Sequence, residues 1–140
     1  GVESNAPNTI NSSCADGNSG TYHSDESIDR MSIATNDGTA FAGGKAVTAS
    51  ITVWCFSSAD SMDLYYTNNV TTPTWTSIGT QACTASGVKT FTATYTLPSS
   101  GANQAIRATF RYNGSASACG TNSGYDDQCA FHGADRTAAS

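Results

Sequence analysis

The segment Val47-Thr-Ala-Ser-Ile-Thr-Val-Trp-Cys55 decides the fold class of this chain. Its odd-numbered positions are apolar, while Thr, Ser and finally Trp54 occupy the positions between them. Successive side chains of a β-strand point to opposite faces, so this alternation predicts a strand with one face in a core. The other face carries hydroxyl groups and ends in the aromatic residues Trp54 and Phe56.

Similar alternation recurs along the chain, and no window has convincing helical spacing. Strands are expected at 28–35, 47–56, 62–67, 75–83, 90–97, 106–112 and 125–131, between turns rich in Gly, Pro and Asn. Seven or eight such strands predict an all-β protein, an antiparallel two-layer β-sandwich of jelly-roll type. The outward Thr rows at 48–52 and 90–96 indicate either an interface or the ordinary preference of Thr for exposed strands.

A length of 140 residues fits a single domain. Residues 1–13 are polar and lack periodicity, so we expect a linker there, followed by the β-sandwich domain at 14–132 and a C-terminal tail at 133–140. This organisation is typical of a module belonging to a longer protein. The sequence has no apolar stretch near the roughly 20 residues that a membrane span needs.

Charge and cysteine content narrow the classes of function. The net charge is −5 and the six Lys and Arg residues are scattered, which argues against a nucleic-acid partner. Five cysteines in so polar a chain favour a secreted protein with two disulfides and one cysteine left over. The residues alone leave the pairing open, and the alternative is a set of reduced, buried cysteines in a cytosolic protein.

Acidic residues gather near the two ends of the chain. If a disulfide joins the ends, these carboxylates converge on flexible loops, the kind of site in which Ca²⁺ finds its oxygen ligands. Calcium is therefore the candidate cofactor, and the candidate ligands are Asp16, Asp25, Glu26, Asp126 and Asp127. The alternative is that these are solvated loop carboxylates. A zinc site built from His23, Cys129 and His132 is a weaker hypothesis because no second paired motif accompanies it.

Three aromatic residues are candidates for ligand binding. Trp54 and Trp75 are of the kind that stack on sugars or clamp peptides, and Tyr65 lies on a strand face opposite Leu64. The alternative for each is packing against the core. No nucleophile elbow or metalloprotease motif is present in the sequence, so we expect a non-enzymatic protein. A small hydrolase using Asp25 or Asp126 is the remaining enzymatic hypothesis.

Several short motifs occur in an order that resembles a C-terminal accessory domain appended to secreted bacterial serine and metalloproteases. They are Cys14-Ala-Asp-Gly, Lys45-Ala-Val-Thr-Ala-Ser-Ile-Thr-Val-Trp-Cys55, Asp63-Leu-Tyr-Tyr-Thr67, Pro73-Thr-Trp-Thr76, Thr92-Ala-Thr-Tyr-Thr-Leu-Pro98, Ala105-Ile-Arg-Ala-Thr-Phe-Arg-Tyr112 and Tyr125-Asp-Asp127. The resemblance implies a non-catalytic β-sandwich with disulfides Cys14–Cys119 and Cys55–Cys83. It also implies a role beside a larger hydrolase.

The chain departs from this pattern after Asp127, where the family tends to continue with further Asp and an apolar strand. Here Gln128 and Cys129 follow instead. Cys129 is therefore expected to be free, to pair between molecules, or to replace Cys14 as the partner of Cys119.

The expected function is a secreted binding or anchoring module of a larger hydrolase. Its partner is a polymeric protein or polysaccharide, a cell surface or the parent catalytic domain, and an aid to folding is a further role. The alternative is a free-standing lectin-like carbohydrate-binding or cell-surface protein.

Overall fold

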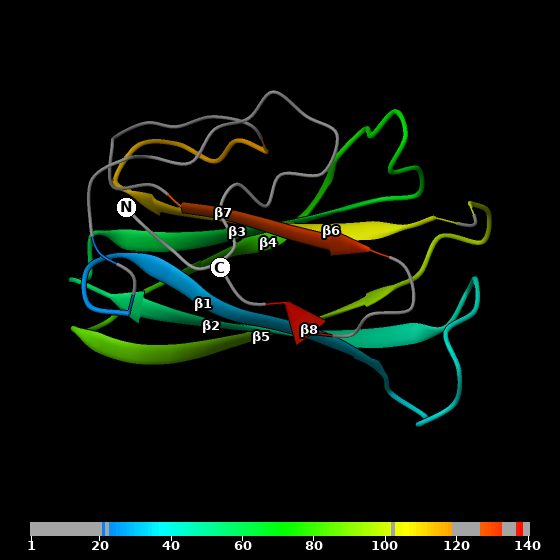
Figure 1. Ribbon diagram of the computed structural model, residues 1–140, viewed down its shortest axis with the longest axis horizontal. Helices are drawn as coiled ribbons and strands as arrows, with labels where there is room; N and C mark the ends of the chain where they lie inside the picture. Colours follow the sequence, from blue (N-terminus) through cyan, green and yellow to red (C-terminus); the bar gives the residue numbers. More distant parts are fainter. Residues whose placement is uncertain (1–20, 22, 102, 119–126, 133–136, 139–140) are drawn as a thin grey trace.

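The alternating segments form antiparallel strands in the computed structural model of the chain, which describes residues 21, 23–101, 103–118, 127–132 and 137–138 (Figure 1). The strands are β1 (Ser27–Thr35), β2 (Ala46–Cys55), β3 (Asp60–Thr67), β4 (Thr76–Ala82), β5 (Gly87–Thr96), β6 (Ala105–Tyr112), β7 (Asp127–His132) and β8 (Thr137–Ala138). Strands β1 to β7 overlap the predicted segments. The short β8 lies within 133–140, the segment expected as a tail, and pairs with β1 through Met31 and Ser32.

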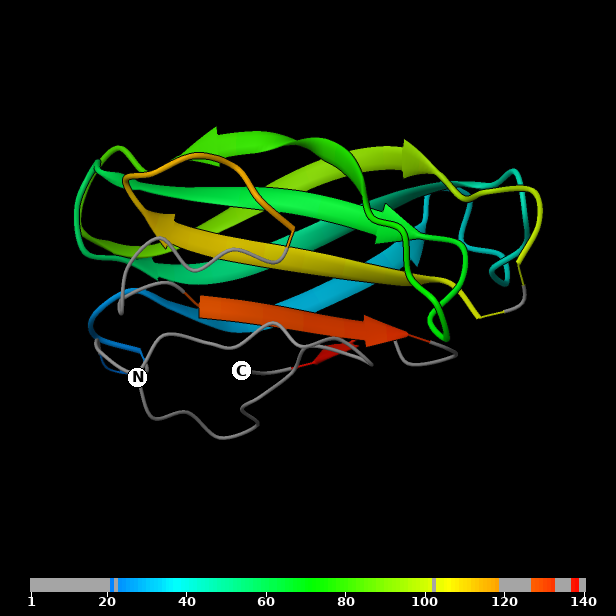
Figure 2. The same ribbon diagram turned by 90° about the horizontal axis from the view of Figure 1, so that it is seen from above.

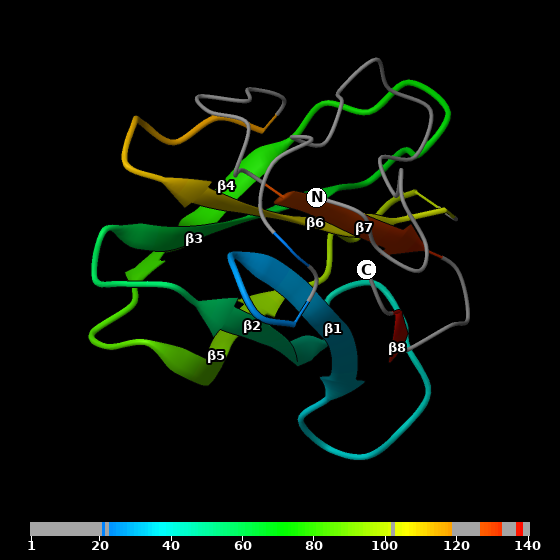
Figure 3. The same ribbon diagram turned by 60° about the vertical axis from the view of Figure 1, so that its left-hand side comes forward.

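The strands belong to two antiparallel sheets. One sheet has the order β5-β2-β1-β8 and the other the order β4-β3-β6-β7. Figures 2 and 3 show the two sheets lying face to face. The described residues contain no helix, so the prediction of an all-β chain built from antiparallel sheets is confirmed.

The core lies between the sheets and follows the alternation seen in the sequence. The four apolar residues of β2 that alternate with hydroxyl residues are all 0% exposed: Val47, Ala49, Ile51 and Val53. The opposite sheet contributes Leu64 of β3 and Phe110 of β6, both 1% exposed or less. Side chains from both sheets therefore share one apolar cluster, and burying it is the main driving force for holding the layers together.

A disulfide between Cys55 and Cys83 ties the two sheets at one end. Cys55 ends β2 in the first sheet, and Cys83 directly follows β4 in the second; their Cα atoms are 6.1 Å apart. This pairing agrees with the one implied by the family resemblance. The other implied bridge, Cys14–Cys119, lies outside the described residues, and Cys129 is described only as part of the β7 backbone.

The outward faces of the two sheets differ. Alternation along β3 places Asp63, Tyr65 and Thr67 away from the core, yet they are only 1%, 6% and 1% exposed. The segment after β6 lies against the same sheet. Nη1 of Arg107 donates a 2.8 Å hydrogen bond to the carbonyl of Ala118, which holds the segment after β6 against the strand.

Among the residues that the structure describes, no helix has the length and apolar character needed to cross a membrane.

Candidate functional site

The outer face of the first sheet is open and covered with hydroxyl groups. Strand register places Thr48 opposite Thr94, Ser50 opposite Thr92 and Thr52 opposite Thr90. The outer pairs are hydrogen-bonded, with Oγ1 atoms 3.0 Å apart for Thr48 and Thr94 and 2.9 Å apart for Thr52 and Thr90. We call these six residues the hydroxyl face. The predicted hydroxyl-bearing side of this strand is therefore present, and it extends over two neighbouring strands.

Three apolar residues lie at the Cys55 end of this strand pair, and we call Trp54, Val88 and Phe56 the aromatic end. Trp54 lies opposite Val88 in the register, so both continue the outer rows of the hydroxyl face. Val88 is 57% exposed and Phe56, directly after β2, is 56% exposed. Trp54 is half-buried. Large apolar side chains at such exposure favour contact with a ligand or partner.

His23 supports Trp54 from the loop before β1. Its ring lies 5.3 Å from the Trp54 ring between centroids, at an interplanar angle of 55°. The imidazole is fixed in turn because Nδ1 of His23 lies 2.5 Å from Oδ2 of Asp29, whose Oδ1 accepts a hydrogen bond from the Ser27 hydroxyl. Ser27 donates to the carboxylate and not to the imidazole. The three residues therefore form a positioning network for Trp54, and not the serine-to-histidine arrangement of a nucleophilic triad.

Two acidic side chains meet beneath this loop. Glu26 is 6% exposed and Asp60, at the start of β3, is 0% exposed. Oδ2 of Asp60 accepts hydrogen bonds from the backbone N–H of Phe56 and of Ser57, at 2.8 and 3.4 Å. The Glu26 side chain adds a hydrogen bond to the same carboxyl group. Two carboxyl groups in contact need a shared proton or a cation, because like charges at this separation repel strongly.

Burial raises the pKa of Asp60 above its ordinary value, and the nearby charge of Asp25 raises it further. The hydrogen bonds from Phe56, Ser57 and Glu26 act in the opposite direction. Oδ1 of Asp60 is buried and has no hydrogen-bond partner among the described residues. The acid pair therefore leaves one buried carboxyl oxygen of Asp60 available to a proton or a cation.

The loop that carries Glu26 has an unusual backbone. His23 and Glu26 adopt positive φ angles of 59° and 53°. Residues other than Gly rarely occupy this region, and such conformations persist only where surrounding contacts hold them. Here the contacts of His23 with Asp29 and of Glu26 with Asp60 do so, so the same loop positions both the acid pair and the support for Trp54.

The other predicted binding aromatics lie against the second sheet. The Trp75 ring is half-buried, with the Arg107 guanidinium 4.2 Å from its centroid. Arg107 is 0% exposed, and burial lowers its pKa to about 10. Cation–π contact thus helps stabilise this buried charge. Tyr65 is 6% exposed, so neither ring offers the open surface seen at the aromatic end.

Of the five predicted calcium ligands, Asp25 and Glu26 lie in the described loop beside Asp60. Asp16 and Asp126 lie outside the described residues, and Asp127 is described only as the first backbone position of β7. Within the part of the chain that the structure describes, no three His, Cys, Asp or Glu side chains are grouped to hold a metal. Asp60 was not predicted, because it lies far in sequence from the acidic ends.

No protein-family model matches the chain, and the search of curated proteins also gave no match. The resemblance to protease accessory domains therefore stays a prediction based on the motifs quoted above.

Proposed function

We propose that this domain is a secreted, non-catalytic binding module that attaches a larger hydrolase to a polymeric ligand. The observation that carries the proposal is the outer face of β2 and β5, whose hydroxyl rows continue into Trp54 and the exposed Val88, with the exposed Phe56 directly after β2. Residues opposite each other on neighbouring strands lie about 4.5–5.5 Å apart, and alternate residues along a strand about 6.6 Å apart. The hydroxyl groups therefore form a regular array, which suits a ligand with repeating polar groups.

The hydroxyl face and the aromatic end offer a ligand two different kinds of contact. The hydroxyl groups both donate and accept hydrogen bonds, and the aromatic end supplies apolar area for sugar rings or side chains. Neighbouring hydroxyls already bonded to each other, such as Thr52 and Thr90, are held in place before a ligand arrives. Binding then costs less side-chain ordering than it does on a flexible surface.

A pull-down against insoluble cellulose, chitin, collagen and bacterial cell wall tests this proposal. We expect the domain to sediment with at least one polymer, and Phe56→Ser to reduce the bound fraction severalfold because it removes exposed apolar area. Thr84→Val, an exposed position just beyond Cys83, is the matched surface control and should bind like the wild type. Failure to sediment with all four polymers would leave only a role in folding or stability.

We also propose calcium as the ion of the acid pair, with Glu26 and Asp60 among its ligands. Calcium prefers carboxylate and carbonyl oxygens on loops, and it completes its shell with about six to eight of them. The unpartnered Oδ1 of Asp60 fits that chemistry. Further oxygens are to come from Asp16, Asp126 and Asp127, as the sequence predicted.

Thermal unfolding in calcium and in EDTA tests this assignment. Calcium should raise the melting temperature of the wild type, and Asp60→Asn should remove most of that increase. In EDTA the variant should melt a few degrees higher at pH 7, because Asn keeps the bonds to the Phe56 and Ser57 amides without a buried charge. About 1 kcal/mol corresponds to roughly 2–6 °C for a domain of this size.

The pH dependence in EDTA provides the control. A carboxyl group with a raised pKa stabilises the fold in its protonated form, and this contribution is lost as the pH rises through the folded-state pKa. The advantage of Asp60→Asn should therefore shrink as the pH falls from 7 toward 4. An advantage that does not change with pH contradicts the buried-charge account, and equal melting in calcium and EDTA contradicts the ion.

The same proposal includes a jelly-roll type of sandwich, because four of the connections, β2–β3, β4–β5, β5–β6 and β7–β8, cross between the sheets. A free-standing carbohydrate-binding protein is the alternative that the hydroxyl face also suits. The open reading frame around the chain distinguishes the two, since a catalytic domain in the same polypeptide identifies an appended module.

A further inference from the structure

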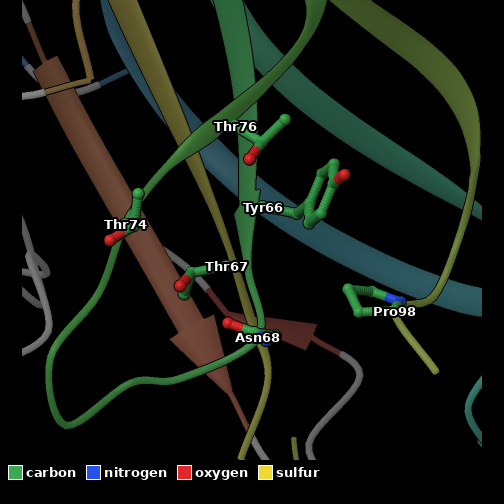
Figure 4. A pocket seen from close by; sticks show the side chains of 6 residues that line it. All are labelled: Tyr66, Thr67, Asn68, Thr74, Thr76 and Pro98. Atoms are coloured by element: carbon green, nitrogen blue, oxygen red, sulfur yellow. The ribbon is translucent and has the colours of Figure 1, made fainter. Parts of the chain in front are cut away.

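A hollow of about 290 Å³ opens at the end of β3, beside the start of β4, and no sequence pattern predicted it. It is lined by Tyr66, Thr67, Asn68, Thr74, Thr76 and Pro98. Figure 4 shows Tyr66 and Pro98 on one side of β3 and Thr67 and Thr74 on the other, so the hollow wraps around the end of the strand. Because β3 runs from Asp60 to Thr67, it lies at the opposite end of the sandwich from Trp54.

The lining combines three threonine hydroxyls, one amide, one phenol ring and one proline ring, and it contains no charged side chain. A charged ligand would find no ion partner among these groups. The Thr67 hydroxyl is already bonded to the Asn69 backbone. A purely apolar ligand would offer nothing to the hydroxyls of Thr74 and Thr76 or to the amide of Asn68. A neutral ligand with many hydroxyl groups and apolar ring faces satisfies both, because Tyr66 and Pro98 offer flat apolar contact.

The Tyr66 ring is held before any ligand binds. It stacks on Tyr95 of β5 with centroids 5.2 Å apart and an interplanar angle of 16°. Tyr66 is half-buried, so the stacking leaves part of its surface accessible. An aromatic platform fixed in this way loses little entropy on binding.

The loop walls are fixed as well. Oδ1 of Asn69 accepts a 2.9 Å hydrogen bond from the Thr71 amide, and the Val70 amide donates to the Asn103 carbonyl at 3.0 Å. On the other wall, Nε2 of Gln104 donates to the carbonyls of Pro98 and Gly101 at 2.9 and 3.0 Å.

The two walls meet where glycine is required. Gly101 has a φ of 105°, and a Cβ atom there would collide with the backbone carbonyl of Asn68. This close approach holds the two loops beside each other. Together with the bonds above, it makes a preformed site.

We infer that this hollow is a binding subsite for a neutral sugar residue of a polysaccharide or glycan. Its volume is at the lower end of the range for ligand sites, roughly 300–1,000 Å³, so it suits one or two rings. The assignment rests on the proposal that the domain is a binding module, and it adds a second contact point at the far end from the aromatic end. Two separated contacts on one domain strengthen the hold on a long polymer.

Titration calorimetry with cellohexaose, maltohexaose, laminarihexaose, mannohexaose and N-acetylchitohexaose tests the subsite. We expect at least one hexasaccharide to bind. Thr76→Val, an exposed isosteric change, should weaken its affinity about fivefold to tenfold through the loss of one hydrogen bond. Tyr66→Leu should weaken it by about tenfold or more through loss of the ring contact.

Thr84→Val lies two residues beyond β4, at the other end of that strand from Thr76, and should leave the affinity unchanged. Unchanged melting of Thr76→Val separates a binding defect from a folding defect. Wild-type affinity in both hollow variants, or the absence of binding by all five sugars, overturns the subsite. If Phe56→Ser alone abolishes polymer binding, the proposed function stands and the subsite fails. The sugar assignment is also overturned if the hollow variants bind every sugar like the wild type and lose binding to collagen alone.

Discussion

Replacing Cys55 and Cys83 together by alanine is expected to lower the free energy of unfolding by about 3–4 kcal/mol. The disulfide closes a loop between positions 28 residues apart and joins the ends of β2 and β4 across the two sheets. Cutting it restores conformational freedom to the unfolded chain and removes the covalent link between the layers. Both sulfurs are buried, at 1% and 3% residue exposure, so a smaller packing loss adds to the effect.

Urea unfolding followed by tryptophan fluorescence measures this change. Mass-spectrometric mapping of the double variant controls for new pairing among Cys14, Cys119 and Cys129. A loss below about 1 kcal/mol in a correctly mapped variant would contradict a stabilising role for this disulfide and would mean that the core alone holds the two sheets together.

Removing Asp63 is expected to cost about 3 kcal/mol, the lower end of the range for breaking a buried ion pair. Asp63 is 1% exposed, and its Oδ2 accepts a 2.7 Å hydrogen bond from Nε of Arg111. Its Oδ1 also accepts a 2.6 Å hydrogen bond from the Thr80 hydroxyl on β4. In Asp63→Ala the guanidinium of Arg111, with only 12% of its side chain exposed, loses its counterion.

The matched control is Asp37→Ala, which removes an ion pair between Asp37 and Lys45. The side chain of Asp37 is 57% exposed. Solvent screens such pairs, and the exposed Thr39 groups that also donate to Asp37 can bond to water instead, so the urea midpoint of this variant should stay close to the wild-type value. In the double variant Asp63→Leu/Arg111→Met, apolar groups replace both charges and much of the lost stability should return. An Asp63→Ala variant as stable as Asp37→Ala would contradict the burial of this pair.

Alternation was enough to predict most of the fold. The pattern from Val47 to Cys55 predicted which side chains of β2 are buried and which carry the hydroxyl face, because the strand period fixes both sides at once. The pattern did not reveal β8, since a strand of two residues has no period to detect. Nor did it indicate that Asp63 and Tyr65 are buried, because alternation alone places them on the face away from the core.

The candidate site was predictable only in part. Trp54 and Phe56 follow from the strand pattern, and Glu26 from the concentration of acids near the ends of the chain. Asp60 and Val88 needed the folded structure, because their roles arise from partners that the sheet brings together: Glu26 in one case and Trp54 in the other. The Tyr66 hollow likewise depends on the meeting of Asn68 and Gly101, which are far apart in the chain.

An adsorption isotherm on the polymer that retains the domain most strongly tests the central claim, that the hydroxyl face and its aromatic end form a binding surface. The account predicts saturable binding by the wild type and a dissociation constant raised about tenfold or more by Phe56→Ser, with Thr84→Val unchanged. Equal isotherms for the wild type and Phe56→Ser, or binding that does not saturate, would contradict it.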